Sequence, residues 1–233
     1  MREPVLKSSL VHVSEVPQPV PIPVQTVLWQ VDLQRDFMLP GGALYVQGAE
    51  HLLPNIRRLV DLARKRRAFL ISSACQHTPN DPEFSEFPPH CLRGTPGAEL
   101  LPEACVGKLF TVPNDHAFAL PGDLLERKQV MFEKQNINVF TNPHVSTTVN
   151  RFPRDTEFIV FGVVTEYCVQ MAANGLLDRG RCTAVVVDAI ETLDKEAGRG
   201  TLSQLAARGA RLILTDEVCR SASPSRNGDA VTR

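Results

Sequence analysis

Runs of apolar, β-branched residues alternate along the chain with stretches that have the period of a helix, and this alternation constrains the fold more than any other feature. The apolar runs have no polar residue at every second position, so both faces of each strand are expected to be buried. Strands are expected over residues 26–33, 68–74, 129–134, 157–164, 182–189 and 210–216, and helices over residues 55–67, 166–180 and 199–209. Strands that are buried on both sides and separated by helices form a mostly parallel sheet. The sequence therefore predicts an α/β fold, a three-layer α/β/α sandwich.

The two ends of the chain differ from this pattern. Residues 1–25 include the proline-rich run VPQPVPIPV, which favours an extended N-terminal arm over a helix. Residues 220–233 are polar and contain Ser, Pro and Gly, so a disordered C-terminal tail is expected there. Residues 26–219 between them are expected to form one domain. One hypothesis for the arm is that it packs across a contact between subunits.

Charge and cysteine usage narrow the function classes. The formal net charge is −1, so no basic surface favours nucleic acid as a partner. No apolar run is long enough to span a membrane, and no basic segment followed by an apolar one suggests secretion. The six cysteines have no disulfide-framework spacing. We therefore expect a cytoplasmic protein with reduced thiols, in which a special cysteine is a metal ligand or a nucleophile.

Ligands of parallel α/β sheets bind beyond the carboxyl ends of the strands. Asp32 and Lys134 fall at two such ends, and Cys168 begins the helix that follows a third. A thiol in the first turn of a helix is expected to have a lowered pKa because of the helix dipole. Asp32 would accept its proton and Lys134 would stabilise the thiolate, which predicts covalent acyl transfer. The alternative for each residue alone is structural: a buried small thiol, a capping acid and a solvated lysine.

The segment SSACQHTPNDPEFSEFPPHC, residues 72–91, contains the types of side chain that bind metals. Its four prolines exclude a helix or a central strand. It is therefore either a surface loop with polar side chains or a loop that closes around a metal. The candidate ligands are Cys75, His77, Glu83 and His90.

Four separated motifs resemble those of the isochorismatase-like cysteine hydrolases, and most closely the nicotinamidase branch. They are VDLQRDFMLPGGALYVQGA, PPHCLRGTPGAEL, FEKQNINVF and GVVTEYCV, and the resemblance covers residues 26–218. It implies the fold of that family and a catalytic triad of Asp32, Lys134 and Cys168. It also implies an oxyanion hole formed by the backbone N–H groups of Val164 and Cys168, beside a cis peptide bond between residues 163 and 164.

The same resemblance implies a divalent metal beside the triad. His77 and His90 match the shared histidine positions, and Glu83 lies where some relatives supply a carboxylate. Cys75 stands where the family has Asp. Thiolate, imidazole and carboxylate together favour Zn²⁺ over Mg²⁺ or Mn²⁺. The alternative is a site that has lost its metal, with Cys75 packed as an apolar residue.

The function that the resemblance implies is deamidation of nicotinamide to nicotinate and ammonia through a thioester on Cys168. The metal would bind the pyridine nitrogen and orient the amide. Phe37, Phe87 and Phe140 are expected to line the substrate pocket, although each fits a core position too. Alternatives are hydrolysis of another small amide, ureido or N-carbamoyl compound, a non-catalytic metal-binding relative, and, less favoured, isochorismatase activity. The expected partners are a small-molecule amide and further copies of the chain in a homo-oligomer.

Overall fold

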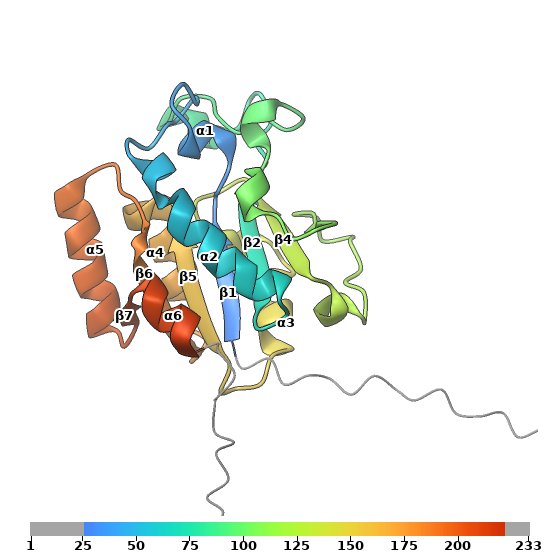
Figure 1. Cartoon of the computed structure of the whole chain (residues 1–233). Coiled ribbons are helices and arrows are strands. Elements are labelled where there is room, and N and C mark those ends of the chain that lie inside the picture. The colour runs from blue at the N-terminus through green and yellow to red at the C-terminus, as the bar shows by residue number, and fades with distance from the viewer. Residues whose placement is uncertain (1–25, 222–233) are drawn as a thin grey trace, which may run out of the picture.

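Seven parallel strands form a central sheet in the order β3-β4-β2-β1-β5-β6-β7 (Figure 1). The computed structural model describes residues 26–221. The strands are β1 (Thr26–Val31), β2 (Phe69–Cys75), β3 (Phe110–Val112), β4 (Gln129–Lys134), β5 (Glu157–Gly162), β6 (Cys182–Ile190) and β7 (Arg211–Ile213). Each neighbouring pair runs parallel, which confirms the predicted sheet.

Helices cover both faces of this sheet. They are α1 (Arg35–Met38), α2 (Leu53–Arg64), α3 (Val145–Asn150), α4 (Gln170–Leu177), α5 (Lys195–Ala207) and α6 (Thr215–Ser221). Apolar residues of α2 and α6 pack with Leu28 and Leu70 in one core. Residues of α3, α4 and α5 pack with Trp29 and Val160 in a second core. Because successive strand residues point to opposite faces, the strands contribute side chains to both cores. The predicted α/β/α sandwich is confirmed.

Several elements differ from the sequence prediction. Strand β3 is only three residues long and lies in a segment that was expected to be irregular. The last strand is shorter than predicted, because α6 begins at Thr215 and continues to Ser221, beyond the expected domain limit at residue 219. The extended arm expected over residues 1–25 lies outside the described residues. So does the tail expected over residues 220–233, except for Arg220 and Ser221, which belong to α6.

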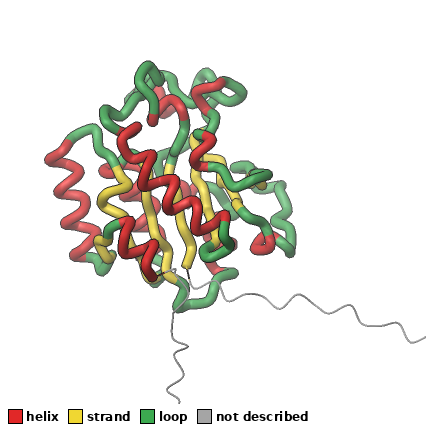
Figure 2. Tube along the Cα trace, in the orientation of Figure 1, coloured by secondary structure: helices red, strands yellow, loops and turns green. Residues whose placement is uncertain are grey.

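Loops gather at the end of the molecule where the strands finish, at the top of Figure 2. In the middle of the sheet β4, β2, β1 and β5 are neighbours, so their carboxyl ends meet there. Asp32, directly after β1, has a positive φ of 51°, and its N–H donates to Ser73 O at 3.0 Å. A Cβ on Gly162 would lie 2.1 Å from Val31 O, so only glycine lets β5 approach β1 beside Asp32.

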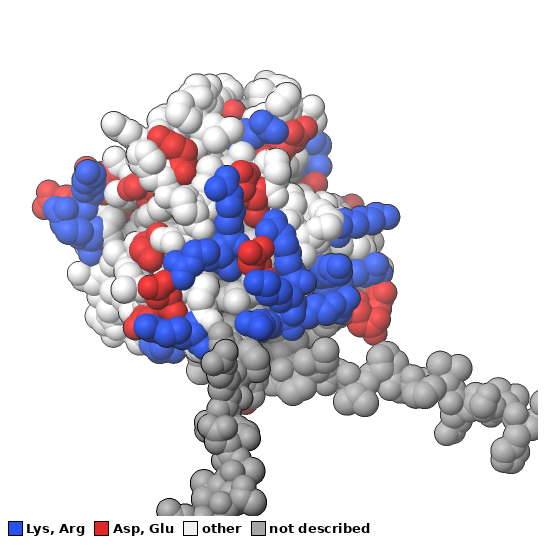
Figure 3. Space-filling view, viewed as in Figure 1, with Lys and Arg blue, Asp and Glu red and all other residues white. Residues whose placement is uncertain are grey.

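The face covered by α2 and α6 carries charges of both signs (Figure 3). The arginines of α2 are all paired with acids: Arg57 with Glu103, Arg58 with Asp216 and Arg64 with Asp61. Exposed pairs of this kind add little stability, but they balance the charge of the helix locally. No helix within residues 26–221 is both long and apolar enough to cross a bilayer.

Candidate active site

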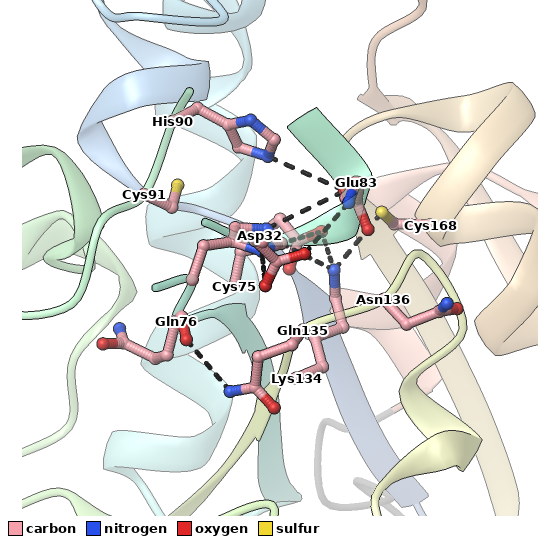
Figure 4. Close-up of polar contacts among 12 residues, drawn as sticks. Asp32, Cys75, Gln76, Glu83, His90, Cys91, Lys134, Gln135, Asn136 and Cys168 are labelled. Atoms are coloured by element: carbon pink, nitrogen blue, oxygen red, sulfur yellow. Dashed lines mark hydrogen bonds and ion pairs between the residues drawn. The ribbon is translucent and has the colours of Figure 1, made fainter. Parts of the chain in front are cut away.

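The structure brings Asp32, Lys134 and Cys168 together at the carboxyl end of the sheet (Figure 4). Lys134 Nζ lies 2.9 Å from Asp32 Oδ2 and 3.4 Å from Cys168 Sγ. The Cys75 thiol lies on the other side of Lys134 and is 4.0 Å from Asp32 Oδ2. The side chains of Asp32, Lys134 and Cys168 are all buried. The cation therefore contacts both the expected base and the expected nucleophile, and all three are shielded from water.

The electrostatics of Cys168 differ from the sequence expectation of a lowered pKa. Burial raises the pKa of the Cys168 thiol, the negative charge of Asp32 raises it further, and Lys134 opposes both. The helix dipole is outweighed because the sulfur is buried beside a carboxylate. Burial also works against the charge of Lys134, but Asp32 and the sulfurs of Cys168 and Cys75 raise its pKa, so the ammonium form is kept. Cys168 therefore rests as a thiol whose proton has to leave during attack.

The turn before α4 forms the other wall of this site. The peptide bond between Val163 and Val164 is cis, as the family resemblance predicts. A π-helical turn, Thr165–Val169 (η7), follows it and runs into α4. Val164 and Cys168 both line the cavity described below. The N–H groups of a first helical turn have no partners within the helix, so this is where an oxyanion could be bound, and the oxyanion hole stays a prediction.

The four expected metal ligands also lie near one another, and Figure 4 labels three of them, Cys75, Glu83 and His90. One ligand atom from each of Cys75, His77 and His90 lies within 4.8 Å of the others, and all three residues are buried. Glu83 Oε1 is 3.8 Å from His77 Nε2 and 3.8 Å from His90 Nε2. Four ligands of a tetrahedral Zn²⁺ lie about 3.3 to 3.8 Å apart, so the observed spacing is close to that of a metal site.

The hydrogen bonds of the two histidines test whether these residues fit a metal. His90 Nδ1 lies 2.8 Å from Pro88 O, which can only accept, so Nδ1 carries the ring hydrogen and Nε2 has a free lone pair. His77 Nδ1 lies 3.0 Å from Asp81 Oδ2, although not in the geometry of a hydrogen bond, and its buried Nε2 also has no hydrogen-bond partner among the described residues. Burial lowers the pKa of His90 and so favours the neutral ring. The Nε2 atoms of His77 and His90 are each 3.8 Å from Glu83 Oε1, so two imidazole nitrogens and a carboxylate oxygen lie where they could bind one divalent cation.

Supporting residues that the sequence did not indicate hold these ligands in place. Gln34 donates to Cys75 O at 2.7 Å and accepts from Cys75 N at 2.8 Å, so it fixes the backbone at this position. Asp36 Oδ2 accepts from Cys91 N at 2.7 Å, directly after His90. Side chains of this kind orient the ligands of a metal site. Both residues lie within the motif VDLQRDFMLPGGALYVQGA, but nothing in the sequence alone marks their contacts with residues 75 and 91.

Asp81 is a further residue that was missed, although it lies in the acidic segment that suggested the metal. Burial works against the charge of its carboxylate, but its contact with the His77 ring and a hydrogen bond from Glu83 N lower the pKa of Asp81 overall. Asp81 therefore stays ionised beside the His77 ring and fixes which ring nitrogen is free. A carboxylate four residues after a candidate histidine ligand is the signal that could have revealed it.

A small cavity that is open to solvent lies beside the triad and the candidate metal ligands. Its apolar and aromatic lining residues are Phe37, Leu44, Phe87, Ile137, Val164, Tyr167 and Leu193. The reactive lining residues are Cys168, Cys75, Glu83 and His90. The edge of the Phe37 ring contacts His90 at 5.1 Å between centroids, and Phe87 contacts Tyr167 at 5.4 Å. The walls therefore present flat apolar surfaces next to a thiol.

Phe140, the third aromatic residue expected in the pocket, is not among the lining residues. Its ring packs 5.9 Å from Trp29 and lies 4.0 Å below the guanidinium of Arg179. A Cβ on Gly175 would come within 2.2 Å of this ring, so the glycine makes room for it. The structure thus assigns Phe140 to the second core, because the turn Val139–Thr141 directs it away from the cavity.

A parallel sheet that carries a buried Asp, Lys and Cys at its carboxyl end defines a class of hydrolases built around a cysteine. Residues 26–217 match the family model of the isochorismatase domain, and the chain therefore belongs to the isochorismatase family. A nicotinamidase of Escherichia coli (strain K12) is 23% identical over 206 residues, which cover 78% of this chain and 91% of that protein. This likeness supports the conclusion that the chain is an amidohydrolase of this family.

Two further likenesses bear on the site. A "probable inactive nicotinamidase" of Arabidopsis thaliana is 32% identical over 85 residues, which span 33% of this chain and only 43% of that protein. The structure of a pyrazinamidase of Pyrococcus horikoshii in complex with zinc is 25% identical, with a TM-score of 0.64, and the match covers 82% of this chain and 99% of that one. The zinc of that relative and the Cys/His/His cluster here support a divalent metal.

Proposed function

We propose that this chain hydrolyses small, uncharged aromatic carboxamides, with nicotinamide converted to nicotinate and ammonia as the leading reaction. The observation that carries the proposal is the contact of Lys134 Nζ with Asp32 at 2.9 Å and with Cys168 at 3.4 Å, beside an apolar cavity. A buried thiol with a base and a cation is suited to acyl transfer. The relatives whose names include nicotinamidase and pyrazinamidase suggest the ring of the substrate.

The lining of the cavity favours a neutral substrate. Among the described residues that line it there is no arginine or lysine, and Glu83 would repel an anion. Lys134 is completely buried and already bonded to Asp32, so it does not offer a site for a carboxylate. N-carbamoyl amino acids and isochorismate carry carboxylates that would lose their hydration without a counter-charge. Phe37 and Phe87 instead suit a flat, uncharged ring.

The reaction follows from the contacts of the three buried residues. As the Cys168 sulfur attacks the amide carbon, its proton passes to Asp32, Lys134 stabilises the sulfur while it carries negative charge, and that charge then moves to the amide oxygen. The oxyanion is bound by the N–H groups of Val164 and Cys168. Asp32 returns the proton to the leaving nitrogen, which departs as ammonia and leaves a thioester on Cys168. Water, deprotonated by Asp32, then attacks the thioester. The C–S bond breaks, the carboxylic acid leaves, and Asp32 returns the proton to the Cys168 sulfur, which regenerates the thiol.

Cys75, His77, Glu83 and His90 are the residues that would hold a divalent metal, and the thiolate and imidazole groups favour Zn²⁺. When bound, the metal would supply a Lewis acid that binds a ring nitrogen of the substrate. The ligands themselves act on the cavity without it: His90 supports the ring of Phe37, and Cys75 contacts Lys134 at 2.8 Å.

A second candidate function is that of a metal-binding relative without turnover. Cys75 favours it, because this residue departs from the Asp of the family and its sulfur contacts Lys134. The intact set of Asp32, Lys134 and Cys168 argues against it. Turnover by the wild-type chain would exclude this candidate.

The deciding experiment is ammonia release by the purified chain, with the metal content measured on the same sample. Nicotinamide and pyrazinamide are expected to be substrates, benzamide a poorer one because it has no ring nitrogen, and N-carbamoylglycine inactive. Cys168→Ala is the control for contaminating amidases. Faster release from N-carbamoylglycine than from nicotinamide would contradict the proposal, and absence of release from any amide would favour the relative without turnover.

A further inference from the structure

Glu166 lies in the turn η7, two residues before Cys168, and no step of the reaction above uses its carboxylate. The carboxylate is nevertheless fully engaged. Its Oε1 accepts hydrogen bonds from Leu193 N and Asp194 N, both at 2.9 Å, and its Oε2 contacts Thr192 Oγ1. Glu166 therefore binds the backbone of the segment that follows β6. We call residues 191–194 the mouth segment.

Further contacts join the mouth segment to the turn and to α5. Thr165 N and Thr165 Oγ1 both donate to Glu191 O, at 2.9 and 2.7 Å. At the other end, the Asp194 side chain caps the first turn of α5. A Cβ on Gly198 would lie 2.6 Å from Thr192 Oγ1, so the helix passes close behind the segment. The mouth segment is thus fixed at its two ends, and Glu166 supplies the bonds to its middle.

Leu193 is the residue of the mouth segment that reaches the cavity. Its side chain lines the cavity together with Phe87 and Tyr167, yet 45% of the residue is exposed. An apolar side chain that is half exposed gains little from packing, so its position depends on how its backbone is held. The N–H group of Leu193 is bonded to Glu166. The width of the cavity entrance at Leu193 is therefore coupled to this carboxylate.

We propose that Glu166 is a positioning residue that holds Leu193 at the entrance of the cavity and thereby selects flat substrates. Loss of the carboxylate frees the middle of the mouth segment, so Leu193 no longer presses on a bound ring. Substrate binding weakens while the chemistry at Cys168 is retained, and wider acyl groups are admitted. The selectivity claim rests on the amidase function proposed above, whereas the claim about the entrance does not.

Steady-state kinetics with nicotinamide separate binding from chemistry. Glu166→Ala is expected to raise KM about fivefold, the effect of losing about one net hydrogen bond, with kcat within about twofold of the wild type. Glu166→Gln keeps an oxygen that accepts from the two N–H groups and should restore KM. Leu193→Ala should raise KM similarly, and adding Glu166→Ala to it should have little further effect, because both changes remove the same wall.

A second experiment does not depend on the identity of the substrate. The rates at which N-phenylmaleimide and iodoacetamide alkylate Cys168 are measured by peptide mass spectrometry, and their ratio is taken. The ratio cancels changes in thiol reactivity and reports access for a wide, flat reagent. Glu166→Ala and Leu193→Ala should each raise the ratio, and Glu166→Gln should not. If nicotinamide is not a substrate, this experiment still tests the entrance.

The matched control is Glu217→Ala. Glu217 Oε2 accepts from Leu214 N at 2.8 Å at the start of α6, so this variant also loses a bond from a carboxylate to a backbone N–H, but outside the cavity lining. It should change neither KM nor the alkylation ratio. The proposal is overturned if Glu166→Ala leaves both KM and the alkylation ratio at wild-type values. It is also overturned if this variant lowers kcat at constant KM, because Glu166 would then act only on the turn η7 that carries Cys168.

Discussion

Lys134 Nζ lies closer to Cys75 Sγ, at 2.8 Å, than to Cys168 Sγ, at 3.4 Å. One buried cation therefore contacts both the expected nucleophile and an expected metal ligand, and Asp32 completes its coordination at 2.9 Å. Because charges interact strongly in a buried site, a change of charge at Cys75 should alter the reactivity of Cys168. The candidate metal ligands and the expected acyl-transfer site therefore form one electrostatic unit.

Replacing the nucleophile should stop the reaction without affecting the fold. Cys168→Ala is expected to lower kcat for nicotinamide by at least about a thousandfold, because Cys75, the other thiol that contacts Asp32 and Lys134, does not belong to the turn η7 where the oxyanion would be bound. The melting temperature and the metal content should stay close to those of the wild type. Retention of more than a few per cent of the rate, in a sample free of other amidases, would remove Cys168 from the nucleophile role.

The role of Cys75 can be tested by the optical spectrum of the cobalt form. A thiolate bound to Co²⁺ gives an intense charge-transfer absorption, which Cys75→Ala and Cys75→Asp should both abolish. Cys75→Asp should still bind one metal per chain, whereas Cys75→Ala should bind it at least about tenfold more weakly. The exposed Cys182 provides the control variant, Cys182→Ser. A charge-transfer band that persists in Cys75→Ala would show that Cys75 is not a ligand.

Asp81 is expected to support the metal through His77. Asp81→Asn keeps the shape of the side chain but removes the charge that faces His77 Nδ1 at 3.0 Å. Metal affinity, measured by competition with a chelator, should fall about 10- to 100-fold. Asp123→Asn, which changes an exposed acid paired with Arg127, should leave the affinity unchanged. Equal affinities in the two variants would mean that Asp81 only caps its loop.

The raised pKa of Cys168 predicts how its alkylation depends on pH. Since burial and Asp32 disfavour the thiolate, the thiolate forms only above the usual range of a free thiol, about pH 8.5. The rate of iodoacetamide alkylation at Cys168 should therefore still be rising where that of N-acetylcysteine has levelled off. Asp32→Asn removes a negative charge and should move the rise to lower pH. A rise that is complete below the range of N-acetylcysteine would contradict the assigned direction.

Phe87 and Phe140 should respond oppositely to truncation. Phe140→Ala removes a ring that packs on Trp29, and the free energy of unfolding should fall by about 2 to 4 kcal/mol with KM unchanged. Phe87→Ala removes a wall of the cavity, so KM for nicotinamide should rise while stability changes less. Urea denaturation and steady-state kinetics of the two variants distinguish the roles. An increase in KM for Phe140→Ala would return that residue to the pocket.

The position of the site could be predicted from the sequence because the sheet is parallel. In such a sheet, the residue after each strand lies at the same edge, so Asp32, Lys134 and Cys168 were expected to meet. The two histidines of the proline-rich segment could be assigned for a related reason, since the segment leaves the same edge. The ligand types then indicated the chemistry.

Three features of the site could not be predicted, because they depend on contacts between distant segments or on the depth of burial, and the spacing of residues along the chain indicates neither. Glu166 and Leu193 are separated by 27 residues, and only the folded chain shows that they bond. The direction of the Phe140 side chain depends on one short turn. The pKa of Cys168 was expected to fall because the helix start could be read from the sequence, whereas the depth of burial that raises it could not.

At residue 75, the Gln34 side chain is bonded only to the backbone: it accepts a hydrogen bond from the N–H group and donates one to the C=O group. The side chain at that position is therefore free to change without altering the path of β2. Mutation between Asp and Cys would exchange a hard oxygen donor for a soft sulfur donor on an unchanged backbone. A change of residue at position 75 would therefore alter which ions the site prefers, while the backbone that carries this candidate ligand keeps its bonds to Gln34.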